Sequence, residues 1–185
     1  ERDVMFGPRN FGATDAEAKE RAHEALRLVG LDESLWDRSP FDLSGGQMRR
    51  VAIAGVLASR PDVLIVDEPT AGLDPIGRRD MLALFKRLRE ELNLTLILVS
   101  HDMDDVLTYA ERVVVMERGQ VAFDGDPFEL FQDEALVRRL QLDIPHVLRF
   151  ARDLAPAFGE AVTPLVRTEA ELADWIAEHL RGGAI

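Results

Sequence analysis

The chain has 185 residues, 46% of them hydrophobic, which is enough to form one domain with a buried core. Its formal net charge of −12 argues against general nucleic-acid binding, because a phosphate backbone is held mainly by clustered Lys and Arg. The absence of cysteine excludes a disulfide framework and a thiolate metal site. No apolar run approaches the ~18 residues that span a bilayer, and residues 1–3 do not begin a signal peptide, so a membrane role is expected to require a partner.

The first dozen residues are predicted to be an irregular connector with exposed aromatic side chains, because turn residues and phenylalanines alternate in 6–8 and 11–12. A helix follows, since Thr14 and Glu17 form a capping-box pattern and apolar residues recur on one helical face until Gly30. That face consists of Ala18, Ala22, Ala25, Leu26 and Val29. Such a narrow, alanine-rich face predicts close packing on a neighbouring element.

A loop over 31–43 leads to a glycine-rich segment, 44–47, and to an apolar stretch from Val51 to Ala58 that predicts a second helix. Ser44 stands at the cap position, and the two glycines after it leave backbone N–H groups approachable at the helix start. This arrangement binds phosphate in many proteins. Taken alone, the same residues favour the simpler interpretation of a glycine-rich helix cap.

The chain is organised around the stretch 63–74, which begins with four apolar residues between two prolines and predicts a strand buried on both faces. Asp67 and Glu68 follow at once, at the strand end where ligands bind in open parallel sheets. Two carboxylates that only solvate the strand end are the simpler interpretation of this pair. The segments on either side decide between the two interpretations.

A turn over 70–75 is followed by a helix whose apolar residues Met81, Leu82, Phe85, Leu88 and Leu92 have helical spacing. A second buried strand is predicted over 94–99, and Ser100-His101-Asp102 follows it. A right-handed crossover would make the two strands parallel. We therefore expect Asp67, Glu68 and His101 on the same edge of one sheet.

The remaining chain is predicted to hold a short helix over 103–110, a β-hairpin with strands 112–116 and 121–124, and a helix that starts at Asp126-Pro127. Helices are then predicted over 134–142, 145–158 and 168–180. This tail contains no catalytic constellation and is interpreted as an accessory region for packing or dimerisation. The isolated histidines His23, His146 and His179 are interpreted as surface or packing residues rather than ligands.

Four motifs in this order resemble the nucleotide-binding domain of ABC-type ATPases. They correspond to the signature motif at 43–47, Walker B with its glutamate at 63–68, the D-loop at 71–74 and the switch histidine at 100–101. The segments 6–12, 50–58 and 100–106 further resemble the ATPase subunits of energy-coupling-factor transporters, which import vitamins or transition-metal ions into prokaryotic cells.

The resemblance implies an α/β fold, namely a P-loop NTPase-like ABC ATPase domain with a mostly parallel sheet, here incomplete. Residues 1–132 would form the later portion of this domain, with a helical signature region over about 13–60 and the catalytic sheet over about 61–132. Residues 133–185 would be the C-terminal helical extension.

The resemblance also implies ATP and Mg²⁺ as cofactors and a role for each motif residue. Asp67 would hold Mg²⁺ through water, and Glu68 would polarise the attacking water. His101 would hydrogen-bond the γ-phosphate, and Asp74 would couple the two sites of a dimer. The residues that would cap ATP held on the partner subunit are Ser44, Gly45, Gly46 and Gln47.

The partners implied are a second ATPase subunit, identical or related, a transmembrane coupling subunit and a substrate-binding membrane subunit. Nucleic acid is not among them. The place of action would be the cytoplasmic face of the cell membrane, where the subunit is peripheral.

No G-x-x-x-x-G-K-[ST] pattern occurs in the 185 residues, and the family's adenine-stacking aromatic residue and glutamine loop are also missing. We therefore expect the chain to be the later part of an ATPase and to bind no ATP unaided. The strand at 63–66 would then keep an unpaired edge, which favours association with the missing half or with a partner chain.

Two other classes stay open. Soluble ABC ATPases of DNA repair, translation or iron–sulfur assembly share the motifs, although the chain has neither the heptad runs of the repair members nor the basic linkers of the translation members. An inert structural or assembly fragment is the other alternative, because the phosphate-binding loop is missing.

Overall fold

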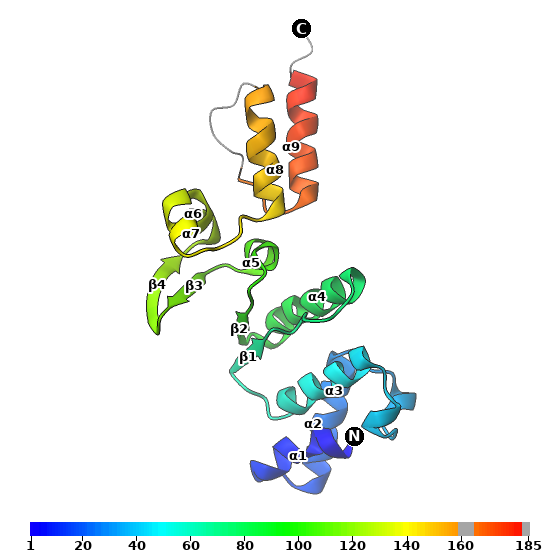
Figure 1. The fold of residues 1–185 in the computed structure, drawn as a ribbon. Helices are drawn as coiled ribbons and strands as arrows, with labels where there is room; N and C mark the ends of the chain where they lie inside the picture. Colours follow the sequence, from blue (N-terminus) through cyan, green and yellow to red (C-terminus); the bar gives the residue numbers. More distant parts are fainter. Residues whose placement is uncertain (159–164, 183–185) are drawn as a thin grey trace. The chain divides into compact units, whose positions relative to one another are not determined.

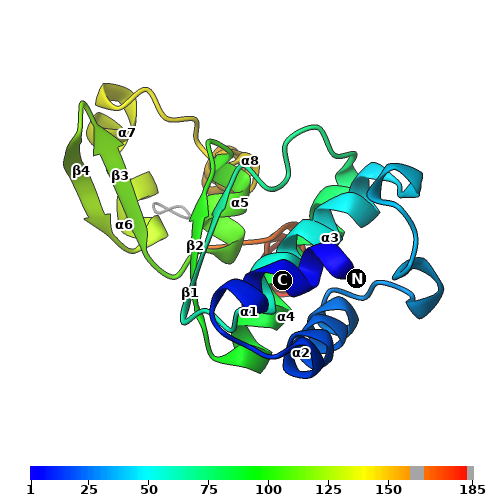
Figure 2. The same ribbon diagram turned by 90° about the horizontal axis from the view of Figure 1, so that it is seen from below.

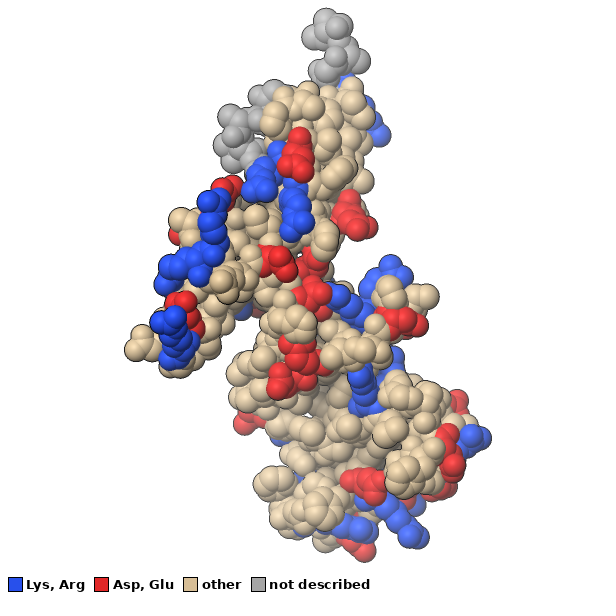
Figure 3. Space-filling model, in the orientation of Figure 1, with Lys and Arg blue, Asp and Glu red and all other residues tan. Residues whose placement is uncertain are grey.

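The structure, a computed structural model, describes residues 1–158 and 165–182 and divides into two compact units, Glu1–Val99 and Ser100–Ile185 (Figure 1, Figure 2). Each unit has a hydrophobic core of its own. On the face drawn in Figure 3, acidic and basic side chains are interspersed on both units. The functional division expected after residue 132 lies inside the second unit and stays a prediction.

The first unit begins with three helices that pack on one another: α1 (Arg2–Asn10), α2 (Asp15–Leu28) and α3 (Gly45–Leu57). The predicted capping box of α2 is confirmed, because Thr14 and Glu17 exchange side-chain and backbone hydrogen bonds. The alanine-rich face is also confirmed, since all five of its residues are at most 2% exposed. Small side chains let the three helices approach closely.

Helix α1 shows that the irregular connector predicted for the first dozen residues is wrong. Gly7 does not break the helix and packs against α3 and the residues after it, where an added Cβ would lie 3.2 Å from the carbonyl oxygen of Gly55 and 2.5 Å from the side-chain oxygen of Ser59. Pro8 is buried within the same helix. The exposed aromatic residues are confirmed, with Phe6 66% and Phe11 80% accessible.

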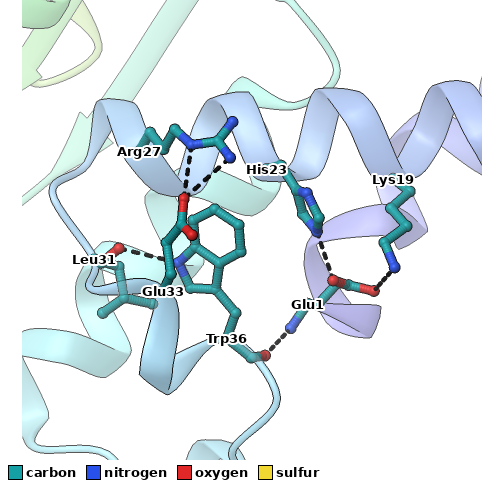
Figure 4. A network of polar contacts seen from close by, with 7 residues as sticks. All are labelled: Glu1, Lys19, His23, Arg27, Leu31, Glu33 and Trp36. Atoms are coloured by element: carbon teal, nitrogen blue, oxygen red, sulfur yellow. Dashed lines mark hydrogen bonds and ion pairs between the residues drawn. The ribbon is translucent and has the colours of Figure 1, made fainter.

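The loop between α2 and α3 is fixed by Trp36, which follows the 3₁₀ helix η1 (Glu33–Leu35) and is 7% exposed. Its indole N–H donates to the carbonyl of Leu31 over 3.0 Å, and its ring lies 4.6 Å from that of His23 (Figure 4). His23 in turn contacts the carboxylate of Glu1 at 2.6 Å. This hydrogen bond lowers the pKa of Glu1, with a smaller contribution from Lys19.

A second 3₁₀ helix, η2 (Pro40–Asp42), leads from this anchored loop to the start of α3. Arg27 of α2 supports the loop through one cation–aromatic contact and one ion pair. Arg27 lies 5.1 Å from the ring centre of Trp36 and pairs with Glu33 at 3.0 Å (Figure 4). The position of the glycine-rich helix start therefore depends on contacts made by the preceding loop.

Strands β1 (Val63–Asp67) and β2 (Thr95–Val99) form a parallel pair, joined by the long helix α4 (Pro75–Leu92). The parallel crossover is thus confirmed. Burial on both faces is wrong, because side chains of one face pack on the core while those of the other are uncovered. The uncovered residues include Val63, Ile65, Ile97 and Val99, which are 45–64% exposed.

The second unit contains the short helix α5 (Met103–Tyr109) and the antiparallel hairpin of β3 (Val113–Glu117) and β4 (Gln120–Gly125). Both were predicted, and the hairpin turn is tighter than expected, with Arg118 and Gly119 at φ 50° and 79°. Helix α6 (Pro127–Gln132) is capped by Asp126. The other helices are α7 (Glu134–Arg139), α8 (His146–Leu154), η3 (Ala155–Phe158) and α9 (Glu169–Gly182).

In the described part of the chain each strand has one partner, so the predicted unpaired edge of β1 is confirmed. Helix α7 stops three residues before the predicted end, and α8 tightens into η3 before Phe158. None of the helices in residues 1–158 and 165–182 combines the length and apolarity needed to cross a bilayer.

Candidate active site

The strand end at Asp67 and Glu68 is the centre of the candidate site. Asp67 is the exposed last residue of β1 and stands opposite Val99 in the register. Glu68 leaves the strand with φ 46°, a left-handed conformation, while its N–H still donates to the carbonyl of Val99 over 2.9 Å. A non-glycine residue in this region is strained and turns the chain sharply. The chain therefore turns away from the sheet directly after Asp67.

The turn after Glu68 is closed by hydrogen bonds from Ala71 N–H to the Glu68 carbonyl and from Leu73 N–H to the Thr70 carbonyl. Asp74 then caps α4, and its carboxylate accepts the N–H of Gly77 at 2.6 Å. This geometry accounts for Asp74 as a helix cap. Its predicted role in coupling two sites stays a prediction.

The glycine-rich segment forms the start of α3 by the predicted means. The side chain of Ser44 accepts the N–H of Gln47, and the side chain of Gln47 accepts the N–H of Ser44 at 2.9 Å. A Cβ added at Gly45 or Gly46 would meet no atom within 4 Å. Since the capping box uses the N–H groups of Ser44 and Gln47, those of Gly45 and Gly46 stay available on an open surface.

Arg49 joins these two parts of the site, and the sequence reasoning missed this role. Its guanidinium donates to the carbonyls of Pro69 and Ala71, at 3.3 and 2.6 Å. The start of α3 is thereby tied to the turn after Glu68. The adjacent Arg49-Arg50 pair is the only sequence signal, and Arg50 instead donates to the carbonyl of Val29.

His101 belongs to the second unit, two residues after the end of β2. The side-chain oxygen of Ser100 accepts the N–H of Asp102 at 3.1 Å, which bends the chain around the exposed His101. Asp102 then caps α5 by accepting the N–H groups of Asp104 and Asp105. The expected proximity of His101 to Asp67 and Glu68 stays a prediction.

The described residues contain no group of three or more His, Asp or Glu side chains that could hold a metal ion by themselves. The three isolated histidines contact other parts of the protein: His23 the carboxylate of Glu1, His146 that of Asp104, and His179 the carbonyl of Trp175. These contacts agree with the surface or packing role expected for them.

Comparison with known proteins supports this description. Residues 3–71 match the profile of the family described as ABC transporter. The chain is 55% identical over 184 residues to the energy-coupling factor transporter ATP-binding protein EcfA2 of Lactiplantibacillus plantarum, covering 100% of this chain and 62% of that protein. The chain therefore spans less than two thirds of the length of this curated relative.

Two solved structures are similar to the chain. CbiO1 from Clostridium perfringens, part of the ABC transporter complex CbiONQ, shares 42% identity and a TM-score of 0.63 over 78% of this chain and 57% of that chain. The dimeric ATP-binding cassette MJ0796, in a post-hydrolysis state bound to ADP and Pi, shares 34% identity and a TM-score of 0.52 over 63% of this chain and 50% of that chain. The chain is thus similar, over its whole length, to an ATP-binding protein of an energy-coupling factor transporter, and the part of it that CbiO1 covers has the fold of an ABC ATPase domain.

Proposed function

We propose that the chain is the later part of an ATPase subunit that powers import through an energy-coupling-factor transporter. The observation that carries the proposal is the strand end at Asp67-Glu68, tied through Arg49 to a helix start with two available N–H groups. Phosphoryl transfer to water needs charge stabilisation and positioning more than covalent chemistry. The carboxylate pair would position water and metal at one nucleotide, and the helix start would stabilise phosphate charge on the nucleotide of a second subunit.

Asp67 is the residue that would hold Mg²⁺, through water. The ion is commonly bound by one or two carboxylates together with substrate phosphates, and it keeps several waters. Asp67 is a single exposed carboxylate at a strand end, and the described residues contain no larger cluster of acids and histidines that could hold a metal. This arrangement fits that donor set. The ion would supply neutralisation of the phosphate charge.

Glu68 would accept a hydrogen bond from the attacking water and so orient and polarise it. Its left-handed backbone conformation turns the chain directly after Asp67, which suits two adjacent carboxylates with separate roles. His101 would hydrogen-bond the γ-phosphate. Asp74, at the start of α4, would couple the two sites of a dimer.

The start of α3 would act on nucleotide held by a second ATPase subunit. The N–H groups of Gly45 and Gly46 point out of the helix start, where the positive end of the helix dipole favours anions. Ser44 and Gln47 would hold this start in shape through their capping box. Two such subunits arranged head to tail would then complete two sites.

The phosphate-binding loop and the membrane subunits would come from outside these 185 residues. No phosphate-binding loop occurs in the chain, which spans 62% of the length of its relative from Lactiplantibacillus plantarum. We infer that the chain binds no ATP unaided. Its further partners would be a transmembrane coupling subunit and a substrate-binding subunit, with the ATPase at the cytoplasmic face of the membrane.

The test uses the full-length ATPase that contains this chain, assembled as a dimer. Glu68→Gln keeps the shape of the side chain but removes its charge, so ATP hydrolysis is expected to fall by about 10²–10³-fold while ATP binding is kept. Glu91→Gln, at an exposed position of α4, is the matched control and is expected to keep full activity. Undiminished hydrolysis by Glu68→Gln would overturn the assignment.

A further inference from the structure

Helix α5 is too short to hold its own position. It has seven residues, and isolated helices of this length are unstable in water, so tertiary contacts must fix its direction. The helix starts directly after the turn that contains His101 and is capped by Asp102. Contacts that hold α5 therefore also restrain the turn that contains His101.

The first end of α5 is held by α8. The carboxylate of Asp104 accepts both the backbone N–H and the ring Nδ1 of His146, at 2.7 and 2.6 Å. Helix α8 lacks a side-chain cap of its own, because its cap position is Pro145. Asp104 takes the place of that cap from 42 residues away and places an anion at the positive end of α8.

The other end of α5 is held by Arg167, which lies just before α9. One guanidinium nitrogen donates to the last carbonyls of the helix, those of Leu107 and Ala110, at 2.9 and 3.0 Å. The hydroxyl of Thr108 donates back to the carbonyl of Arg167 at 3.3 Å. These carbonyls have no partner within the helix, so the cation both satisfies them and complements the negative helix end.

Arg167 is itself held in place on both sides. Its guanidinium lies over the ring of Phe128, 4.7 Å from the ring centre, and 3.6 Å from the carboxylate of Asp126. Its backbone N–H donates to the carboxylate of Glu171 at 2.7 Å. A planar cation fixed by stacking and by hydrogen bonds at several atoms is a rigid connection.

The middle of α5 contributes Leu107, which is fully buried in the core of the second unit. Its cluster includes Val147, Leu148 and Ala151 of α8 and Leu172 of α9. In Figure 1 and Figure 2, α5 lies next to α8 within this unit. Residues after 133 thus hold α5 at its start, its middle and its end.

We propose that the C-terminal helical region positions His101 for ATP hydrolysis, with Asp104, His146 and Arg167 as positioning residues that act through α5. The inference rests on the proposed function, in which His101 contacts the γ-phosphate. It assigns to the residues after 133 a part in the reaction itself, because loss of the contacts at either end of α5 would loosen the segment that carries His101. Small displacements of a positioned group reduce rates strongly.

The test measures steady-state hydrolysis by the full-length ATPase with Arg167→Gln and Asp104→Asn, each alone and combined with His101→Ala. Arg167→Gln is expected to lower kcat by about tenfold and to change KM for ATP by less than about twofold. His101→Ala is expected to lower kcat by about 10²-fold. If Arg167 acts through His101, the double variant is expected to be no slower than His101→Ala alone.

Arg152→Gln is the matched control, because Arg152 lies in α8 and pairs with Glu134 without touching α5; it is expected to keep full activity. Asp104→Asn acts at the opposite end of α5 and replaces Arg167→Gln if that variant does not fold. The inference would be overturned, and the proposed function kept, by an unchanged kcat in both variants. The same conclusion would follow if the loss of kcat in a double variant equalled the product of the losses in Arg167→Gln or Asp104→Asn and in His101→Ala. Full activity of His101→Ala would overturn the proposed role of His101, and the inference with it.

Discussion

The two sheets of the molecule differ in how their strands are connected and paired. Strands β3 and β4 are joined by a two-residue turn, so their pairing is local, and Arg112 and Asp124 add a bidentate ion pair at 2.7 Å. Strands β1 and β2 are joined through the 18-residue helix α4, so their pairing depends on a crossover. Both pairs are two-stranded, yet only the hairpin can form from adjacent residues.

The difference between the two sheets shows which one leaves an apolar face uncovered. The parallel pair is stabilised through the face that packs on α4, and its other face presents Val63, Ile65, Ile97 and Val99 to solvent. A row of aliphatic side chains on a sheet with open edges is typical of a surface that another layer covers. Asp67 is the last residue of β1, so the candidate site lies on the sheet that has the uncovered face.

Each unit has one tryptophan, Trp36 in the first and Trp175 in the second, so Trp→Phe variants make the two sheets separately observable. The largest expected effect is that of Leu64→Ala in the parallel pair. Leu64 is 3% exposed and packs in the core with α4. Its truncation is expected to cost about 2–5 kcal/mol, measured by urea unfolding with Trp36 as the probe.

Ile65→Thr is the control at the neighbouring position, since Ile65 is 64% exposed on the uncovered face. Its cost is expected to be about 0.5 kcal/mol or less. It is also expected to weaken self-association of the 185-residue chain, measured by sedimentation velocity. Equal costs at the two positions would show that both faces are covered in solution.

A smaller effect is expected at the hairpin turn. Gly119 has φ 79°, and a Cβ there would meet nothing within 4 Å, so Gly119→Ala costs only backbone strain, about 1–2 kcal/mol. Unfolding followed by Trp175 measures it. Arg118→Asn, at φ 50° in the same turn, is expected to keep or raise stability because asparagine tolerates this conformation. No loss in Gly119→Ala would mean that the turn does not fix the hairpin.

The smallest expected effect is the pH dependence of the Arg112–Asp124 pair, which is exposed on both sides. The hydrogen bonds from Arg112 lower the pKa of Asp124 below its ordinary value of 3.8. Because the folded pKa is the lower one, the pair stabilises the fold above that value, and this contribution is lost as the pH falls further. Unfolding followed as the pH falls from about 5 through 3.8 and below should therefore lose part of its pH dependence in Asp124→Asn, whereas Asp153→Asn in α8 serves as control.

Local patterns were predictable from the sequence because their physical causes are local. The capping boxes at Thr14 and Ser44, the hairpin and the proline start of α6 each depend on residues within a few positions of one another. The strand end at Asp67-Glu68 was also predictable, since an apolar run bounded by prolines has few alternatives. The motif order then indicated the family.

Features that depend on distant residues were not predictable. Gly7 and Pro8 suggest a break, and only the close approach of Gly7 to Gly55 of α3 and to Ser59 after it explains why they belong to a helix. The hydrogen bonds of Arg49 and Arg167 join segments 20 to 60 residues apart, and nothing in the spacing of the sequence marks them. Long-range side-chain contacts require the fold before they can be identified.

The bonds from Arg49 to the carbonyls of Pro69 and Ala71 have a mechanical consequence. They connect the start of α3 to the turn after Glu68, although the two segments belong to different parts of the sequence. In a head-to-tail dimer these two surfaces would serve different nucleotides. A shift of α3 caused by ATP on one side would therefore be passed, through a single guanidinium, to the glutamate that serves the other.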